Sequence, residues 1–291
     1  MQIFLTISGF LYGGKLISDD IAFYKRKLKQ ILVPYYITIV VVLLIQLSFL
    51  DTQLSFETII KVFSCNATLQ GGEHLWFVPT ILMCYFFTPF FQKCFKSNES
   101  IYQVLLCLAI LTVIAFELFI PYFNSAWIVC YLLGYVFGYQ SNHKMIVEKK
   151  IFCCSLIMIA VCTNAAQVYL KYIARVGFGL RYRSMFQLFC DYAHTFLGVA
   201  IFIILRKLFG VVVDKKVFSR FLGIIRISDK YSYEWYLVHQ FFILGPMSLM
   251  NLTDYLLTNI AAIVLVVCFT SYILKITVNY IEKISERVFL L

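Results

Sequence analysis

Long apolar runs are the feature that most constrains how this 291-residue chain can fold. A helix needs roughly 20 apolar residues to cross a bilayer whose hydrocarbon core is about 30 Å thick. Runs of about this length lie at 31–50, 76–95, 101–120, 126–140, 151–170, 187–209, 232–250 and 257–281, and residues 1–14 form a shorter one. The sequence therefore predicts an all-α fold, a polytopic membrane bundle of about nine transmembrane helices.

Composition supports a chain embedded in lipid. Charged residues make up 14% of the sequence, whereas soluble domains carry about 25%. The net charge of +10 suggests a nucleic-acid partner at first sight, but we expect none, because the cations follow the membrane topology described next. The ten cysteines lie mostly inside apolar runs without a CxxC spacing, so we expect neither a disulfide framework nor a metal site.

The loops between the predicted helices carry lysine and arginine unevenly. Alternate loops hold 19 of the 25 basic residues on one side and five on the other, and Lys275 lies inside the last helix. The positive-inside rule places the richer side in the cytoplasm. We therefore expect a multi-pass protein of the cell membrane with a cytoplasmic C-terminus. No internal repeat or linker interrupts the chain, so residues 1–291 are predicted to form a single membrane domain.

Polar and basic residues interrupt the apolar pattern first near the N-terminus. Ser8 and Gly9 are small residues of the kind that let membrane helices approach closely. The basic run Lys25–Lys29 follows. It could anchor a helix in the cytoplasmic interface, or it could bind phosphate groups, which clustered arginine and lysine suit.

A second polar segment lies around His74, where Gly71 and Gly72 precede Glu73, His74 and Trp76. Trp76 could be an interfacial belt residue. Alternatively, His74 and Glu73 beside a flexible glycine pair could line an outward-facing substrate cleft.

A third segment contains Ser232, Tyr236 and His239, whose spacing of i, i+4 and i+7 predicts one helical face. His239 could be a neutral histidine hydrogen-bonded between helices. It could also transfer protons, because imidazole titrates near neutral pH.

A fourth segment contains Asp191 and His194, three residues apart, after an outer loop that holds Arg181 and three other basic residues. An aspartate next to a histidine can orient and charge it. The other interpretation is an internally paired polar patch at the membrane edge. None of the four segments has a spacing that fixes a reaction, since the sequence has no Walker loop, GxSxG or HExxH motif.

Six short pieces in order give the chain a resemblance to a known family. They are Phe4–Leu11 (FLTISGFL), a basic stretch Lys25–Tyr35 that ends in Pro-Tyr, Leu75–Val78 (LWFV), Gly134–Gly138 (GYVFG), Ser232–His239 (SYEWYLVH) and Ile281–Lys283 (IEK). In these pieces the chain resembles the acyltransferase 3 family, multi-pass membrane acyltransferases that modify cell-surface carbohydrates.

The resemblance implies an activity and its partners. It implies ten core helices in a bacterial inner or plasma membrane, an acyl-CoA donor reached from the cytoplasm, and a carbohydrate acceptor on the outer side. The expected function is O-acylation, with acetyl-CoA as the default donor and an envelope or exported polysaccharide as the acceptor. We expect no tightly bound cofactor, and the expected partners are membrane lipid, acyl-CoA and the carbohydrate.

The resemblance also suggests roles for residues named above. Lys25, Arg26 and Lys29 are expected to bind the donor, although the family often has two arginines where this chain has Arg26 and Lys29. His239 is expected to support catalysis. The expected acceptor cleft contains His74, Trp76, Asp191, His194 and Arg181.

The N-terminus departs from the family pattern. The family's first helix ends in a histidine considered essential for acyl transfer, just before the segment that corresponds to Ser8–Phe10, whereas this sequence begins at Met1. We therefore expect the first helix and its histidine to be absent, through a misassigned start, a true truncation or supply by a partner, which would leave the chain as written inactive. Two other functions stay open: a transporter or flippase for lipid-linked sugars, and a degenerate, non-catalytic membrane subunit.

Overall fold

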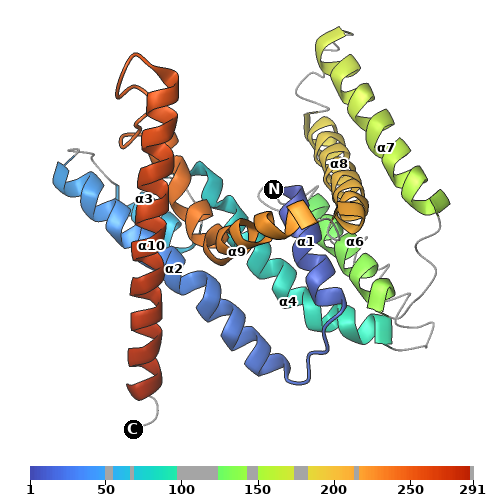
Figure 1. The fold of residues 1–291 in the computed structure, drawn as a ribbon, viewed down its shortest axis with the longest axis horizontal. Coiled ribbons are helices and arrows are strands. Elements are labelled where there is room, and N and C mark those ends of the chain that lie inside the picture. Colours follow the sequence, from blue (N-terminus) through green and yellow to red (C-terminus); the bar gives the residue numbers. More distant parts are fainter. Residues whose placement is uncertain are drawn as a thin grey trace. The chain divides into compact units, whose positions relative to one another are not determined.

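The computed structural model describes residues 1–49, 55–65, 69–96, 124–142, 150–173, 183–212 and 216–288, and these residues form helices, turns and loops without strands (Figure 1). The helices are α1 (Gln2–Gly13), α2 (Asp20–Phe49), α3 (Phe56–Phe63), the 3-10 helix η1 (Glu73–Trp76), α4 (Phe77–Lys96), α6 (Ser125–Asn142), α7 (Lys150–Val168), the π-helical turn η2 (Tyr169–Ile173), α8 (Arg183–Val212), α9 (Lys216–Ile243) and α10 (Leu256–Val288).

The prediction of an all-α polytopic membrane bundle is confirmed. Five segments are long and apolar enough to cross a membrane, namely Asp20–Ser48, Glu73–Phe95, Cys153–Tyr172, Met185–Gly210 and Leu256–Ile284. The apolar helices α1 and α6 are shorter. The predicted span at 101–120 lies outside the described residues.

One predicted boundary is wrong. The apolar run at 232–250 suggested a single span, but α9 begins at Lys216 and ends at Ile243. Gly245 then adopts a φ of +86°, which favours glycine, and Pro246 has no backbone N–H to continue the helical hydrogen bonds. The apolar residues that follow therefore do not continue the helix but form non-helical turns.

The contacts within the chain divide it into two compact units. Unit 1 comprises Met1–Phe23 and Met83–Asp214, and unit 2 comprises Tyr24–Leu82 and Lys215–Leu291. The prediction of a single membrane domain stays a prediction.

Unit 1 is built around a very close crossing of α1 and α6. Gly9 and Gly13 of α1 face the backbone of α6, and Gly134 and Gly138 of α6 face the backbone of α1. A Cβ atom at any of these positions would overlap a carbonyl oxygen of the opposite helix. Small residues that allow such an approach are typical of membrane helix pairs. The SGF and GYVFG pieces of the sequence are therefore two halves of one helix contact.

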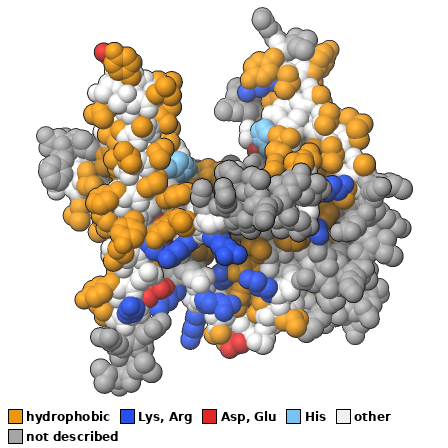
Figure 2. All heavy atoms as spheres, viewed as in Figure 1, with side chains coloured by type: hydrophobic (Ala, Val, Ile, Leu, Met, Phe, Trp, Pro, Cys, Tyr) orange, Lys and Arg blue, Asp and Glu red, His pale blue; other side chains and the backbone are white. Residues whose placement is uncertain are grey.

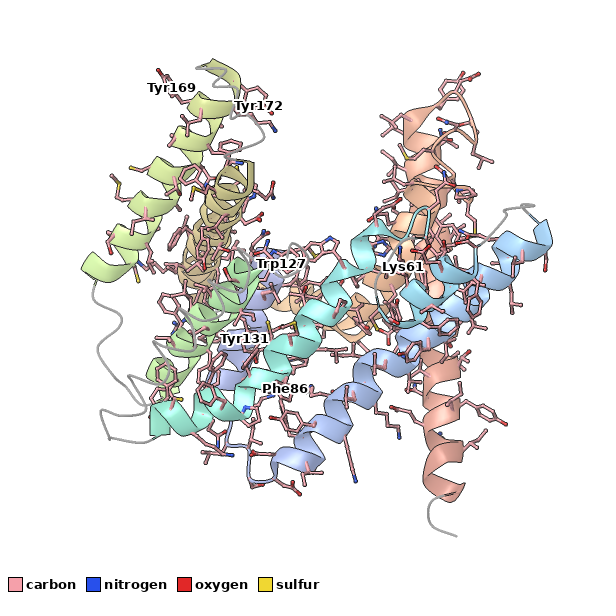
Figure 3. All side chains as sticks on the ribbon, turned by 180° about the vertical axis from the view of Figure 1, so that it is seen from behind. Lys61, Phe86, Trp127, Tyr131, Tyr169 and Tyr172 are labelled. Atoms are coloured by element: carbon pink, nitrogen blue, oxygen red, sulfur yellow. The ribbon has the colours of Figure 1, made fainter. Side chains whose placement is uncertain are left out.

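Unit 1 contains tyrosines both in its core and on its surface. The Tyr131 side chain is buried, and its hydroxyl lies 2.7 Å from the Thr88 hydroxyl (Figure 3). Tyr169 and Tyr172 of η2, which follows α7, are exposed (Figure 3). Tyrosines at the end of an apolar helix are typical of a membrane–water interface.

Unit 2 places hydrogen bonds between its helices and loops. The Tyr35 hydroxyl donates to the Val62 carbonyl at 2.6 Å, which ties α2 to α3. The Tyr233 hydroxyl of α9 donates to the Ile31 carbonyl of α2 at 2.9 Å. Along α10, Figure 2 shows hydrophobic side chains over most of the visible surface, as expected for a helix that faces lipid.

The short helix α3 was not predicted. Its first turn is capped by the Ser55 side chain, which accepts a hydrogen bond from the Thr58 N–H. Glu57 and Lys61 form an exposed i,i+4 ion pair, and the hydrogen bond from Lys61 lowers the pKa of the Glu57 carboxyl. A helix of eight residues is too short to show in a search for membrane spans.

Candidate functional site

Two histidines that are far apart in the sequence lie side by side in unit 2. The ring centroids of His74 (η1) and His239 (α9) are 5.0 Å apart, with the rings inclined at 70°. The Tyr236 ring lies 5.2 Å from the His74 ring and 6.1 Å from the His239 ring. We call His74, Tyr236 and His239 the histidine cluster.

The local sequence explains how η1 brings His74 to α9. Gly71 has a φ of +82°, and a Cβ atom there would lie 2.8 Å from the Leu244 carbonyl oxygen. Gly72 packs against Leu69 and the Phe241 ring. Gly71 therefore allows the close approach of this turn to the end of α9, and the interpretation of the glycine pair as flexible stays a prediction.

The hydrogen bonds of His239 fix its tautomer. Its Nδ1 lies 2.9 Å from the Tyr236 carbonyl oxygen and 3.1 Å from the Trp235 carbonyl oxygen. Carbonyl oxygens only accept hydrogen bonds, so Nδ1 carries the proton and donates it. In the neutral imidazole, the Nε2 atom of His239 therefore keeps its lone pair.

His74 has the opposite tautomer. Its Nε2 lies 3.3 Å from the Leu237 carbonyl oxygen, so Nε2 is the donor. Its Nδ1 is buried without a hydrogen-bond partner among the described residues, and His74 as a whole is only 5% exposed. The Tyr236 hydroxyl donates to the His74 carbonyl oxygen and holds the turn against α9.

The cluster can take part in proton transfer. Each imidazole keeps one nitrogen lone pair, and imidazole is the side chain whose ordinary titration lies nearest to neutral pH. His239 is partly exposed and His74 is buried, so the Nε2 atom of His239 is the more accessible of the two. A partly exposed base with a fixed tautomer suits the removal of a proton from a hydroxyl.

Ser232 does not join the cluster. Its hydroxyl is exposed and donates to the Asp229 carbonyl oxygen at 2.9 Å. Of the face predicted from Ser232, Tyr236 and His239, the structure brings only the last two to His74.

The other predicted acceptor residues lie in different parts of the structure. Trp76 is in η1 with His74 in unit 2, whereas Asp191 and His194 lie on α8 in unit 1. Arg181 lies outside the described residues.

Asp191 and His194 have separate partners. The Asp191 carboxylate accepts hydrogen bonds from the Asn124 amide at 2.8 Å and from the Gln187 amide at 3.2 Å. The Nε2 atom of His194 lies 3.4 Å from the amide nitrogen of Gln167 on α7. These carboxylate, amide and imidazole groups come from α7, α8 and the residue before α6, and groups of these kinds can hydrogen-bond to hydroxyl groups.

The predicted donor-binding residues follow one another on the first turns of α2. Lys25 and Arg26 are exposed and Lys29 is half-buried. Arg26 and Lys29 are three residues apart and therefore share a face of the helix. The Lys27 ammonium between them donates to the Gln30 side chain at 2.8 Å.

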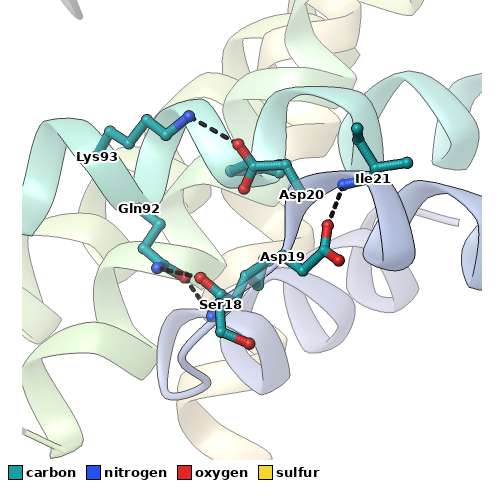
Figure 4. Close-up of a pocket in the computed structure, with 8 residues that line it drawn as sticks. Ser18, Asp19, Asp20, Ile21, Gln92 and Lys93 are labelled. Atoms are coloured by element: carbon teal, nitrogen blue, oxygen red, sulfur yellow. Dashed lines mark hydrogen bonds and ion pairs between the residues drawn. The ribbon is translucent and has the colours of Figure 1, made fainter.

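A pocket in unit 1 was not predicted (Figure 4). It has a volume of about 720 Å³ and is lined by Ile17, Ser18, Asp19, Asp20, Ile21, Pro89, Gln92 and Lys93. Its polar groups are largely paired with one another. The Gln92 amide bonds both the N–H and the C=O of Ile17, at 2.8 and 3.0 Å, and Lys93 lies 2.7 Å from Asp20. Asp19 could have been recognised in the sequence as the N-cap of α2, because aspartate is a preferred residue there. No sequence pattern indicates that Gln92 bonds to the backbone of Ile17.

The part of the chain that the structure describes contains no group of three or more His, Cys, Asp or Glu residues that could hold a metal ion. Glu234 of α9 is buried as well; no role was predicted for it from the sequence, although a carboxylate next to apolar residues of a membrane protein is itself a signal.

Comparison with known proteins identifies the family. The model of the acyltransferase 3 family, described as an acyltransferase domain, matches residues 1–275. No curated protein and no solved structure matches the chain. Since the match covers nearly all of the sequence and the fold is a bundle of apolar helices, the chain belongs to the acyltransferase 3 family and is a membrane acyltransferase.

Proposed function

We propose that this protein is an acyl-CoA-dependent O-acyltransferase that transfers an acyl group, acetyl in the first instance, to a hydroxyl of an envelope or exported polysaccharide. The observation that carries the proposal is the histidine cluster, in which His239 keeps an accessible lone pair on Nε2. Family membership supplies the reaction class.

The reaction needs a group that accepts a proton. The acceptor hydroxyl oxygen bonds to the thioester carbonyl carbon, the carbon–sulfur bond breaks, and the departing thiolate takes up the proton that the hydroxyl lost. We assign the proton transfer to the Nε2 atom of His239. His74 and Tyr236 fix the position of this imidazole by packing against it. General-base catalysis of this kind contributes about 10²–10⁴-fold to a rate.

The donor is proposed to bind at the start of α2. Arg26 and Lys29 share a helix face, and Lys25 is exposed beside them. Arginine and lysine bind phosphate by charge-assisted hydrogen bonds, and CoA carries several phosphate groups. The excess of basic residues in alternate loops favours a cytoplasmic location for this end of α2 and for the C-terminus.

The residues of the predicted acceptor cleft are proposed to bind the acceptor, each group within its own unit. His74 and Trp76 supply a polar and a flat aromatic side chain in unit 2, and Asp191 and His194 supply hydrogen-bonding groups in unit 1. Sugar hydroxyls fit carboxylate and imidazole partners. Arg181 remains a proposed contributor.

Acyl transfer from labelled acetyl-CoA in membranes that contain the protein tests the proposal. The H239Q variant keeps a polar side chain of similar size but cannot accept the proton, so we expect transfer to fall by about 10²-fold or more. An R26A/K29A double variant is expected to raise the KM for acetyl-CoA by about tenfold or more, since each charge-assisted hydrogen bond contributes about 1.5–3 kcal/mol. K61A, which removes an exposed lysine of α3, is the control and should change neither quantity.

Full activity of H239Q would refute the proposed role of His239 in proton transfer. An unchanged KM in R26A/K29A would refute the proposed donor site. In cells, deletion of the gene should remove acetyl esters from the polysaccharide while polymer export continues. Loss of export with the esters intact would instead favour transport of a lipid-linked sugar.

A further inference from the structure

A buried ion pair joins α9 to α10 in unit 2. Glu234 is 1% exposed, and its Oε1 lies 2.7 Å from the Nζ atom of Lys275, whose side chain is 30% exposed. Lys275 lies inside the apolar segment Leu256–Ile284. Charged side chains within membrane helices are costly, and they are functional candidates for that reason.

The interface between α9 and α10 also contains buried polar atoms that form no hydrogen bond to another described residue. The Oε2 atom of Glu234 and the Oγ atom of Ser271 on α10 are both buried, and neither has a hydrogen-bond partner within the described residues. An apolar replacement of a buried ion pair is often neutral or even stabilising. Stability therefore explains the presence of these polar groups poorly. A better explanation is that they hold α9 and α10 in one relative orientation.

Glu234 and the histidine cluster lie on opposite sides of α9. Residues two apart on an α-helix differ by about 200° in direction, so Glu234 and Tyr236 point away from each other. On the Tyr236 side, α9 is tied to η1 through the Tyr236 hydroxyl and the His74 ring. On the Glu234 side it is tied to α10 through Lys275.

We propose that Glu234 and Lys275 are positioning residues for the proposed acyl transfer: their ion pair fixes the rotation of α9 about its own axis, so that His239 and Tyr236 face His74. The expected effect of the ion pair on kcat rests on the proposed function. The Tyr233 and Tyr236 hydroxyls hold one side of α9 against α2 and η1, and the 2.7 Å bond between Glu234 and Lys275 holds the other side against α10. Rotation by a single residue position, about 100°, would leave the Glu234 carboxylate without its cation.

The first test is the double variant E234Q/K275M, which removes both charges, so that neither partner is left as an unpaired ion. We expect folded protein to accumulate, the KM for acetyl-CoA to stay unchanged, and kcat per folded molecule to fall by about tenfold or more, since small misplacements of a catalytic group can cost about 10²-fold. The K275R variant keeps the ion pair and should retain most of the wild-type kcat.

The matched control is E57Q/K61M. It removes the same two charge types from the exposed pair of α3, also in unit 2. Exposed pairs contribute about 0–1 kcal/mol, so this variant should keep both kcat and KM.

Tryptophan emission provides a measurement that does not depend on activity. The chain has three tryptophans, and in a W127F background only Trp76 of η1 and Trp235 of α9 remain. If the ion pair sets the rotation of α9, E234Q/K275M in this background shifts the emission maximum, whereas E57Q/K61M does not.

The outcomes separate the two proposals. Wild-type kcat and an unshifted emission maximum in E234Q/K275M overturn the positioning role. Less folded protein with unchanged kcat per folded molecule also overturns it and assigns the pair to stability. If the wild-type protein transfers no acyl group, the proposed function fails, and the emission measurement still decides whether the pair positions α9.

Discussion

Replacing Gly9 by alanine should separate α1 from α6. A Cβ atom on Gly9 would overlap the Tyr131 carbonyl oxygen and lie 2.8 Å from the Tyr135 nitrogen, whereas ordinary contact begins at 3.4 Å. The helices must therefore move apart by about 0.6 Å to relieve the nitrogen and further to relieve the oxygen. Both obstructing atoms belong to helix backbone, so no side-chain rotation can relieve them.

The expected energy follows from two opposing effects. Forcing an extra carbon into a closely packed contact costs about 1–3 kcal/mol. Alanine regains up to about 1 kcal/mol over glycine inside a helix. We therefore expect G9A to lower the free energy of unfolding of unit 1 by up to about 3 kcal/mol, with about 1–2 kcal/mol as the middle of the range, and G134A, on the opposite helix, to do the same.

Gly210 supplies a matched control, because a Cβ atom there has no other atom within 4 Å. G210A should leave the stability unchanged or raise it by up to about 1 kcal/mol. Thermal unfolding of the purified protein in detergent measures all three variants, and a loss of 1 kcal/mol corresponds to a fall in Tm of about 2–4 °C. If G9A melts at or above the temperature of G210A, the close crossing of the two helices is refuted.

Two further predictions concern the loop between α9 and α10. Asn259 is 2% exposed, donates to the Met250 and Thr253 carbonyl oxygens, and accepts from the Thr253 N–H, so N259A should destabilise the loop by about 1–3 kcal/mol. Faster limited proteolysis within residues 249–255 measures this, and unchanged cleavage would contradict it. G245A should cost about 1–3 kcal/mol, because the position has a positive φ and a Cβ atom would lie 3.0 Å from Gly71 Cα. A Tm equal to that of G210A would argue against it.

The membrane spans could be predicted because a run of apolar residues is a local property. The runs at 31–50 and 257–281 reappear as the apolar parts of α2 and α10. The end of α9 was missed because hydropathy alone continues past Gly245, where the backbone turns. The helix α3 was missed because its eight residues are fewer than the window of about 11–18 residues over which helical periodicity is recognised.

The site was only partly predictable for a related reason. His74 and His239 could each be singled out as polar residues in apolar surroundings, but their contact joins segments that no spacing rule connects. The tautomers depend on which backbone carbonyls lie nearby, such as that of Leu237, and these positions exist only in the folded chain. The Glu234–Lys275 pair required knowledge of which face of α9 meets α10.

The fixed tautomers of the histidine cluster have a consequence for catalysis. Because the N–H of each imidazole is already held by a backbone carbonyl, neither ring has to turn before it accepts a proton. The local dipoles around the reacting nitrogen are set during folding, so the reaction requires little reorganisation of its surroundings at the moment of transfer. Under the proposed function, a substrate hydroxyl that reaches His239 would thus meet a base whose orientation is already set by the fold.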